Sequence, residues 1–543
     1  MSFQTPSSTA LGWGNFLTDY LGGSVPTGVL DTYLQRALSD AQNGTNGAVQ
    51  GGTIYFPPIG PNAYLFSQTF MITGSCALIS PSSADVSFTF NPSGGTTQSL
   101  FVIEGSNVTI RGFSIQNTNP VVAASGNVAA IQVIGASGVL LEDVLFQEFF
   151  AGVDCVGSSM ICDAVHADGF PVTTGTSQMA FGFRAQPGPG SGSLAGLTMR
   201  IRQSHVGLGL PTSGANTSTG TAGFILVPPY PDMSIENSDS KNGQYGFYIV
   251  AASGSTAGNS GFMRLRNLNS EQSTSVIYAD GGSVIQSGAS VIDGNATYVT
   301  LSTNFAGAAA FAGEHYSSVG QGGGFLIGNP ASGSTPEQPS PAVAAIVGST
   351  LSQANATAGL FLASTASGSV VLSSVAMVNF TTGIQVGAVS AGPATIVGSS
   401  WANSEYGLLV ETPSASATSS VVLEATSIFN PQNPLLSTTF PASGNNVSVH
   451  NGPPLNPAGY DTPLIPSGMS RSVVNNTGYD VVAYIYDVGG KISGITVDEA
   501  NTGISSVATL PATYPVFVPA GATITVNLTS TSSPTFEWTW LAN

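Results

Sequence analysis

A short phrase of alternating apolar and polar residues recurs along most of the chain. In its clearest copy, residues 107–117, apolar side chains occupy every second position on either side of Gly112. Weaker copies lie at 138–146, 232–239, 261–269, 369–377 and 421–429. Alternation of this kind indicates a β-strand with one buried face, and repetition at about 20–35 residues indicates a solenoid of stacked units. Each copy joins two strands through a tight corner, which predicts the coil of a β-helix.

One amphipathic helix is predicted ahead of the coils. Its apolar positions share a single helical stripe and are Leu30, Leu34, Ala37, Leu38 and Ala41. Asp31 suits the first turn, where a carboxylate is stabilised by the helix dipole, and Gly44 and Gly47 end the helix. The first coil of a β-helix would otherwise expose an unpaired sheet edge. We therefore expect this helix to cap the solenoid.

The segment after the helix has the sequence Gly-Gly-Thr-Ile-Tyr-Phe-Pro-Pro (51–58), followed by Tyr64 and an apolar strand. This order resembles the opening of the pectate-lyase-like right-handed parallel β-helix superfamily, to which phage tailspikes and polysaccharide depolymerases belong. Through the coil repeats, the resemblance covers roughly residues 27–450. It implies an all-β fold, a right-handed single-stranded parallel β-helix with an N-terminal cap helix. The catalytic signatures of polygalacturonases and pectate lyases have no match here, so no catalytic residue is transferred from them.

The character of the sequence changes after a proline-rich tract. Residues 468–543 contain short alternating strands around turn residues, which predicts a separate C-terminal antiparallel β-sandwich module. We expect this module to serve trimerisation, as similar modules of phage tail proteins do, or to bind glycans through Trp538 and Trp540. The predicted parts of the chain are an N-terminal arm (1–28), a parallel β-helix with its cap helix (29–452), a linker (453–467) and the β-sandwich (468–543).

Composition narrows the function classes. The formal net charge is −18 with only 10 Lys and Arg residues, which argues against nucleic-acid binding because phosphates must be neutralised by basic side chains. Charged residues make up 7% of the chain and apolar residues 42%, so general disorder is excluded. A polar surface of Ser, Thr, Asn and Gly suits contact with sugars, and it equally suits resistance to extracellular proteases.

Other features exclude further classes of protein. No apolar run reaches the ~18 residues that a membrane helix requires, and no secretory leader is visible at residues 1–6. Cys76, Cys155 and Cys162 lack the spacing of metal ligands. Cys155 and Cys162 could form a disulfide, but we expect all three to be buried thiols. The sequence indicates neither a metal nor a cofactor.

Aligning the repeats places outward residues in columns, with neighbouring coils about 4.8 Å apart. One predicted column contains Arg111, Glu142, Cys162, Arg202, Glu236 and Arg266. Opposite charges on neighbouring strands form a stabilising ladder, and the same row of charges could bind a glycan. The candidate substrate-binding residues are Arg111, Arg202, Arg266, His166, Tyr230 and Tyr245. We expect the two tyrosines to be exposed and to stack on sugar rings, while a lone histidine such as His166 is more often structural.

The adjacent predicted column contains Gly112, Asp143, Asp163, Gln203, Asn237 and Asn267. These residue types tolerate the left-handed backbone of a sharp corner. The column also places two carboxylates on neighbouring coils, and glycoside hydrolysis needs a carboxyl pair ~5 Å or ~6.5–9.5 Å apart. The candidate catalytic residues are Asp143, Asp163 and Asp168, with Glu142 and Glu236 in reserve.

These features together favour a phage tailspike-like receptor-binding protein. We expect a homotrimer on the virion tail that joins the phage tail or baseplate through its N-terminal arm, binds a bacterial surface polysaccharide and depolymerises it. One alternative is a secreted bacterial polysaccharide lyase or glycoside hydrolase. Another is a non-enzymatic adhesin or structural spike.

Overall fold

Two compact units, Met1–Gly322 and Gly323–Asn543, make up the chain in the computed structural model. The described residues are 13–45, 51–60, 63–92, 98–118, 129–169, 181–188, 197–208, 221–228, 232–250, 261–271, 273, 275–281, 283–287, 290–293, 297–302, 305, 308–318, 325–329, 343–362, 370–386, 393–402, 406–410, 420–424, 427–429, 446–450, 470–475, 480–488, 492–505, 513–519, 522–528 and 535–542. The cap helix and the predicted site residues belong to the first unit.

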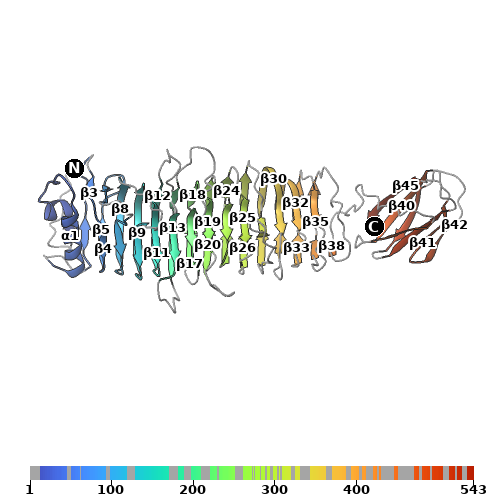
Figure 1. Cartoon of the computed structure of the whole chain (residues 1–543), viewed down its shortest axis with the longest axis horizontal. Coiled ribbons are helices and arrows are strands. Elements are labelled where there is room, and N and C mark those ends of the chain that lie inside the picture. Colours follow the sequence, from blue (N-terminus) through green and yellow to red (C-terminus); the bar gives the residue numbers. More distant parts are fainter. Residues whose placement is uncertain are drawn as a thin grey trace. The chain divides into compact units, whose positions relative to one another are not determined.

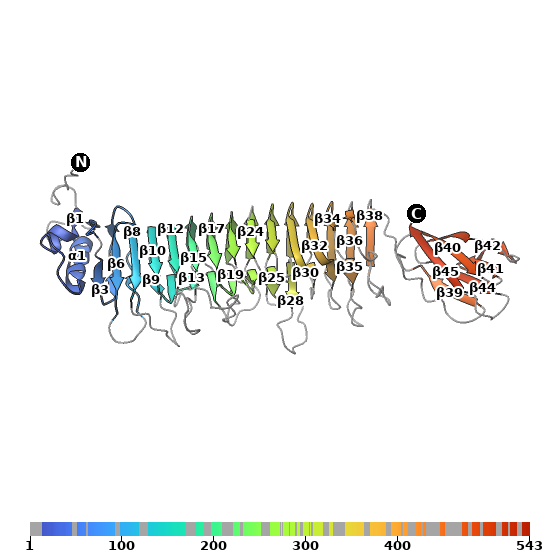
Figure 2. The same ribbon diagram turned by 90° about the horizontal axis from the view of Figure 1, so that it is seen from above.

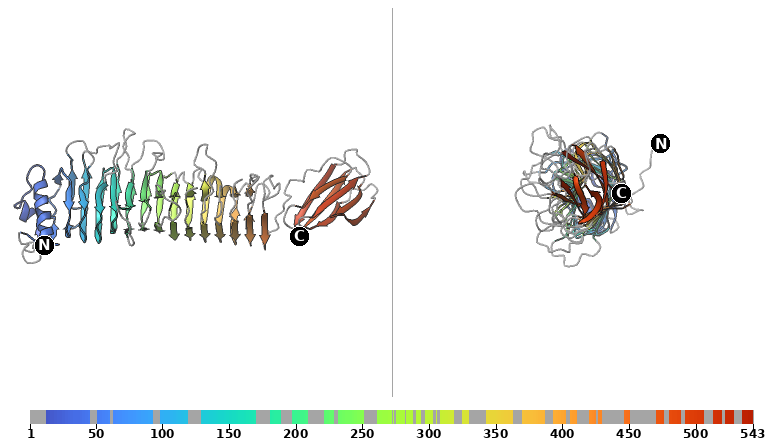
Figure 3. Two further views of the ribbon diagram at one scale, coloured as in Figure 1. Left: turned by 60° about the horizontal axis from the view of Figure 1, so that its bottom comes forward. Right: turned by 90° about the vertical axis from the view of Figure 1, so that its right-hand side faces the viewer.

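The cap helix α1 (Asp31–Asn43) lies against strands β2 (Thr53–Tyr55), β4 (Phe70–Ile72) and β5 (Cys76–Ile79) of the first coils. Figures 1 and 3 show the helix in blue beside these coils. Leu34, Ala37 and Leu38 are buried in the core. Asp31 accepts hydrogen bonds from the amide (2.8 Å) and the hydroxyl (2.5 Å) of Ser67, which ties the first helical turn to the coil. Gly44, at φ 68°, ends the helix in left-handed backbone. The predicted cap helix is confirmed.

Two parallel sheets form the coils of the first unit (Figure 2). Sheet A contains β1 (Trp13–Asn15), β2 (Thr53–Tyr55), β3 (Tyr64–Phe66), β5 (Cys76–Ile79), β6 (Ser87–Phe90), β8 (Val108–Asn117), β10 (Val139–Gln147), β12 (Met160–Asp168), β14 (Thr198–Arg202), β15 (His205–Gly207), β17 (Asp232–Glu236), β18 (Asp239–Lys241), β20 (Phe262–Arg266), β21 (Asn269–Glu271), β23 (Ser283–Ser287) and β26 (Ala308–Ala312). A short π-helix, η2 (Phe16–Tyr20), follows β1.

Sheet B supplies the other strand of each coil. It contains β4 (Phe70–Ile72), β7 (Phe101–Ile103), β9 (Ala129–Ile134), β11 (Ala151–Val156), β13 (Phe181–Gln186), β16 (Ala222–Leu226), β19 (Tyr245–Ile249), β22 (Ser275–Ala279), β24 (Ser290–Asp293), β25 (Thr297–Ser302) and β27 (His315–Ser318). Every pairing between these strands of sheet A or of sheet B is parallel where its register is known, for example Leu141 with Ile110 and Val153 with Ile131. In-register stacking of this kind is the defining feature of a β-helix.

The core consists of columns of apolar side chains that repeat from coil to coil. The inward column of sheet A is Ile110, Leu141, Cys162, Ile201, Ile235 and Leu265, all at most 2% exposed. In sheet B, Phe183, Phe224 and Phe247 stack with ring centroids 5.4 and 5.1 Å apart. The three cysteines are buried free thiols, as predicted. Each coil therefore buries its apolar face only against its neighbours.

The second unit contains further parallel strands and an antiparallel part. The parallel strands are β28 (Phe325–Asn329), β29 (Val343–Val347), β30 (Thr350–Leu362), β31 (Val370–Ser373), β32 (Ala376–Val386), β33 (Pro393–Val397), β34 (Ser400–Ala402), β35 (Tyr406–Val410), β36 (Ser420–Glu424), β37 (Ser427–Phe429) and β38 (Asn446–His450). The antiparallel strands are β39 (Ser470–Val474), β40 (Val481–Val488), β41 (Ile492–Val497), β42 (Ala500–Ser505), β43 (Thr513–Val518), β44 (Thr523–Leu528) and β45 (Thr535–Ala542).

The antiparallel strands form two sheets, β39-β44-β41-β42 and β43-β40-β45. One apolar cluster draws on both sheets, with Ile495 and Ile524 from the first and Ala483 and Val518 from the second. Two sheets that share a core constitute a β-sandwich, so the predicted fold class, a parallel β-helix with a C-terminal β-sandwich, is confirmed. Within the described ranges, none of the helices has the length and apolar character needed to cross a membrane.

Candidate functional site

The predicted charge ladder exists on the outer face of sheet A. Its members occupy one register column and are Arg111, Glu142, Asp163, Arg202, Glu236 and Arg266. Three ion pairs join neighbouring members. They are Arg111–Glu142 at 3.7 Å, Asp163–Arg202 at 3.0 Å and Glu236–Arg266 at 3.3 Å. Ion pairs this exposed contribute at most ~1 kcal/mol each to the free energy of unfolding. The ladder therefore determines the charge pattern of this face and adds little to the stability of the protein.

The third coil differs from its predicted alignment by one residue. Cys162, not Ile161, lies in the buried column between Leu141 and Ile201, and Asp163 occupies the ladder position that was expected for Cys162. Ile161 and Cys162 are adjacent and both apolar, so alternation alone left the register of this strand undecided. Met160 and Cys162 together fill the buried positions that Val139 and Leu141 fill on the preceding strand, and a free cysteine is readily buried as a small apolar side chain.

The corner column is also present, and its backbone is left-handed throughout. The residues and their φ values are Gly112 (84°), Asp143 (51°), Ala164 (52°), Gln203 (50°), Asn237 (49°) and Asn267 (55°). The predicted pairing of Asp143 with Asp163 in this column is wrong, because Asp163 is in register with Glu142. Asp143 instead accepts hydrogen bonds from the amide (3.0 Å) and hydroxyl (2.6 Å) of Ser83. The corner interpretation of the column is confirmed.

Glu142 and Asp163 are therefore carboxylates in register on neighbouring strands, ~4.8 Å apart along the sheet. Each has an arginine on its other side, Arg111 for Glu142 and Arg202 for Asp163. The two arginines neutralise the two carboxylates. This favours a role for Glu142 and Asp163 in stabilising this face of the sheet or in binding a polar ligand. Glu236 is held in the same way by Arg266.

A second cluster of titratable groups lies beyond the corner, on the other half of sheet A. His166, His205 and Asp239 occupy one register column, and Asp168 is in register with Gly207. The Nδ1 atom of His205 lies 2.5 Å from Oδ2 of Asp239, and its Nε2 atom lies 3.6 Å from Oδ1 of Asp168. The rings of His166 and His205 are 6.2 Å apart. We call His166, Asp168, His205 and Asp239 the histidine cluster.

Gly207 makes room for the contact between Asp168 and His205. A Cβ atom at position 207 would lie 3.2 Å from Oδ1 of Asp168 and 3.4 Å from Nε2 of His205. Contacts this short would require one of the two side chains to move. The absence of a side chain at Gly207 thus allows groups on neighbouring coils to approach each other across it.

The electrostatics of the cluster favour a protonated imidazole. The hydrogen bond to Asp239 raises the pKa of His205, and the charges of Asp239 and Asp168 act in the same direction. Burial and the nearby charge of Lys241 oppose this increase. A histidine whose pKa is raised from ~6.5 can donate a proton near neutral pH. No group of His, Cys, Asp or Glu in the described part of the chain is arranged to hold a metal ion.

Sequence reasoning found this cluster only in part. It selected His166 and Asp168, but it did not connect them with His205 and Asp239, which follow 37 and more residues later. The signal was the coil alignment itself, since extending the repeat beyond the corner brings position 166 level with positions 205 and 239.

The predicted tyrosines lie elsewhere. Tyr245 is half-buried on sheet B, where its ring is 4.7 Å from that of Tyr248. Tyr230 lies outside the described residues, as do residues 1–12 of the predicted arm and the whole predicted linker. The structure thus brings the acidic and histidine candidates together on sheet A and leaves Tyr245 on the other sheet.

Comparison with known proteins defines the fold. No protein-family profile matches the sequence, and no curated protein is similar to it in sequence. Among solved structures, the tailspike protein of E. coli bacteriophage HK620 in complex with a pentasaccharide has a TM-score of 0.50 at 11% identity, covering 98% of this chain and 94% of that chain.

Two further structures are more distant. The Dettilon tailspike protein has a TM-score of 0.42 at 12% identity, covering 98% of this chain and 94% of that chain. The catalytic domain of a GH87 α-1,3-glucanase in complex with nigerose has a TM-score of 0.43 at 12% identity, covering 83% of this chain and 70% of that chain. Identities this low concern the fold alone, and they agree with the right-handed parallel β-helix described above.

Proposed function

We propose that this chain is a phage tailspike-like receptor-binding protein that binds a bacterial surface polysaccharide and hydrolyses it at the histidine cluster. The observation that carries the proposal is the position of His205, held between the carboxylates of Asp239 and Asp168 on an outer sheet face. Such an arrangement supplies a proton donor and a carboxylate within one side-chain length of each other. Glycoside hydrolysis requires an acid and a carboxylate ~5 Å or ~6.5–9.5 Å apart, so Asp168 must turn away from its 3.6 Å contact with His205 to act as the base.

In the proposed reaction, Nε2 of His205 donates its proton to the glycosidic oxygen as the bond to the anomeric carbon breaks. A water oxygen bonds to that carbon, and Asp168 takes the proton that the water loses. Asp239 keeps Nδ1 of His205 protonated and fixes the ring, so it is a positioning residue. The Asp168 side chain is 44% exposed, which leaves it free to turn from His205 when a sugar enters. Contacts in an unliganded site commonly rearrange in this way.

Fold and composition support the choice of a polysaccharide. The solved tailspike of similar fold is in complex with a pentasaccharide, which indicates that a β-helix of this kind can present a glycan site. A net charge of −18 disfavours polyanionic ligands that need basic residues. The homotrimer, the virion-tail location and attachment to the tail or baseplate through the N-terminal arm belong to the same proposal. Light scattering tests the trimer, and a monomer would argue against it.

The activity is tested by incubating the full chain with purified capsular polysaccharides and O-antigens and measuring new reducing ends. We expect His205→Gln and Asp168→Asn to lose cleavage but keep glycan binding. Asp232→Asn is the matched control, because Asp232 pairs with Arg264 in the ladder half of the sheet. Undiminished cleavage by His205→Gln would refute the assignment. Binding without cleavage by the unmodified protein would favour the non-enzymatic adhesin, and unsaturated products would favour a lyase.

A further inference from the structure

Three tyrosines pack against one another on two neighbouring coils of sheet B. Tyr245 and Tyr248 belong to β19, and Tyr278 belongs to β22 in register with Tyr248. The ring centroids are 4.7 Å apart for Tyr245–Tyr248, 4.6 Å for Tyr245–Tyr278 and 5.7 Å for Tyr248–Tyr278. We call these three residues the tyrosine platform. Neither the charge ladder nor the histidine cluster includes it.

The platform lies on the outside of the coil. Phe247 and Ile249 are buried in the core, at most 1% exposed, so Tyr248 between them points outward by the alternation of a strand. All three tyrosines are partly exposed. Large aromatic side chains that face outward together leave apolar ring surface in contact with water, and such surface marks a place where a ligand can bind.

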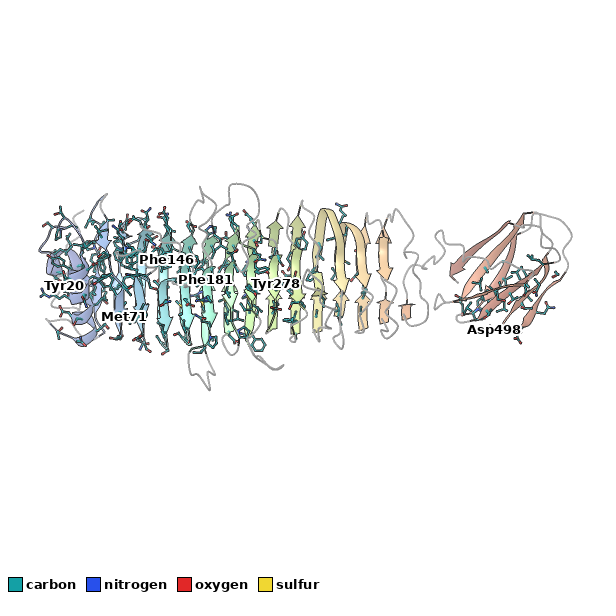
Figure 4. All side chains as sticks on the ribbon, viewed as in Figure 1. Tyr20, Met71, Phe146, Phe181, Tyr278 and Asp498 are labelled. Carbon is teal, nitrogen blue, oxygen red and sulfur yellow. The ribbon has the colours of Figure 1, made fainter. Side chains whose placement is uncertain are left out.

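A buried apolar base holds the platform in place. Tyr245 and Tyr248 pack on a cluster that includes Phe181 and Ile225, which are 1% and 7% exposed. Ile225 precedes Tyr248 in the same register column. Figure 4 labels Phe181 and Tyr278 on this stretch of coils. Because the rings are already packed in place, little side-chain conformational entropy is lost when a ligand binds them.

The charges around the platform select the kind of ligand. Burial raises the pKa of Tyr248 to about 12 and also raises the pKa of Tyr245 and Tyr278, and the charge of Asp280 adds to each increase. The hydroxyl groups are therefore neutral and can donate hydrogen bonds. Arg184, on the same face, is bound to Asp154 at 2.7 Å. An acidic sugar would meet Asp280 there, whereas a neutral sugar would not be repelled.

We propose that the tyrosine platform is a second glycan site, distinct from the histidine cluster, that binds a neutral pyranose segment of the polysaccharide. Tyrosine rings present flat apolar faces and a polar edge, which match the C–H face and the hydroxyl groups of a pyranose. Only the corner residues 242–244 separate Lys241, at the end of β18, from Tyr245 at the start of β19. The platform thus begins one corner after the strand that carries Asp239. This inference rests on the proposed function.

The test measures binding of the full chain to immobilised neutral oligosaccharides released from bacterial O-antigens and capsules, with a polyuronate as the acidic comparison. We expect Tyr278→Thr to bind the neutral glycans about tenfold more weakly, the effect of losing one aromatic contact. Thr300 occupies the next position of this column, so threonine is compatible with the fold there. Tyr278→Phe keeps the ring and loses only the hydroxyl, so its binding should be weakened less than that of Tyr278→Thr. Tyr33→Ala, an exposed tyrosine on α1, is the matched control.

The outcomes separate this inference from the proposed function. If Tyr278→Thr and Tyr248→Ala, both folded by their unfolding temperature, bind and cleave like the unmodified protein, the platform is not a glycan site while the proposed function stands. If the unmodified protein binds only the polyuronate, the neutral specificity is wrong. If it neither binds nor cleaves any glycan of the panel, both proposals fail. Weaker binding by Tyr278→Thr, a smaller loss for Tyr278→Phe and unchanged binding by Tyr33→Ala support the platform.

Discussion

The Nδ1 atom of His205 lies 2.5 Å from Oδ2 of Asp239, a residue 34 positions later on the next coil. The β-helix brings these two side chains together because it stacks β15 directly on β18. The hydrogen bond to Asp239 raises the pKa of His205. A proton donor is thereby created from two side chains that are unremarkable in isolation.

Removing the Asp239 carboxylate should change the pH dependence of cleavage. If protonated His205 is the acid, activity falls as pH rises through its pKa. The hydrogen bond to Asp239 is the largest cause of the raised pKa, so Asp239→Asn should move the alkaline limb of the rate profile to lower pH. The profile of kcat/KM against pH tests this. An unmoved limb with a merely lower rate would assign Asp239 a structural role only.

The opposite shift is expected when Lys241 loses its charge. Lys241 lowers the pKa of His205, so Lys241→Gln should move the alkaline limb to higher pH. Lys241 also pairs with Glu271 at 3.2 Å, and this exposed pair contributes little to stability. Glu271→Gln is therefore the matched control, and it should leave the limb closer to its original position than Lys241→Gln does.

The same contact should make stability depend on pH. The pKa of His205 is raised in the folded protein, so its contribution is complete below the unfolded value of ~6.5 and is lost as pH rises through the folded-state pKa. As pH rises from ~6.5 through the folded-state pKa of His205, the unfolding temperature of the unmodified protein should therefore decrease more than that of His205→Gln. Calorimetric scans on both sides of the window measure the difference. Parallel curves for the two proteins would contradict the coupling.

The corner column allows a matched pair of substitutions with opposite effects. Ala164 has φ 52°, a conformation that costs an L-residue about 1–2 kcal/mol, so Ala164→Gly should stabilise the protein by roughly 1 kcal/mol. At Gly112, φ is 84°, and a Cβ atom would lie 2.6 Å from the backbone oxygen of Ser80. Gly112→Ala should therefore destabilise it by about 1–3 kcal/mol. Thermal unfolding of the two variants checks both signs.

Those parts of the fold that depend on repetition were predictable from the sequence. The recurring phrase around Ile110, the apolar stripe of α1 and the turn residues of the corner column each reflect a local preference that the fold preserves. Gly112, Asn237 and Asn267 tolerate left-handed backbone, and the structure places all three in it. Local pattern and global fold agree at these positions, as expected for a foldable sequence.

The site was less predictable because it depends on register between coils. A shift of one residue at Ile161–Cys162 moved Asp163 from the corner into the ladder and separated it from Asp143. Single-residue shifts reverse which side chains face outward, and two adjacent apolar residues give no signal against them. Asp239 could not be selected from composition or motif, since its role arises only from the contact with His205.

A buried ion pair on sheet B gives the largest expected change in stability. Asp154, 2% exposed, is bound by Nε (3.0 Å) and a terminal nitrogen (2.7 Å) of Arg184, and the amide of Gln186 donates to both of its oxygens. Arg184→Met would leave the carboxylate buried with only Gln186, and removal of one partner of a buried pair costs about 3–5 kcal/mol.

Replacing both partners should be less harmful than replacing one. The double variant Asp154→Leu with Arg184→Met leaves no buried charge, so we expect it to recover much of the unfolding temperature that Arg184→Met loses. Arg266→Met is the exposed control, because the Arg266 side chain is 73% accessible in its pair with Glu236, and its effect should stay within ~1 kcal/mol. A double variant less stable than Arg184→Met would mean that the ion pair, and not the cost of an isolated charge, stabilises this face. The Arg184 guanidinium lies 4.3 Å from the centroid of the Phe181 ring in the base of the tyrosine platform, so in that case both Asp154 and Arg184 should be kept in any variant made to study glycan binding.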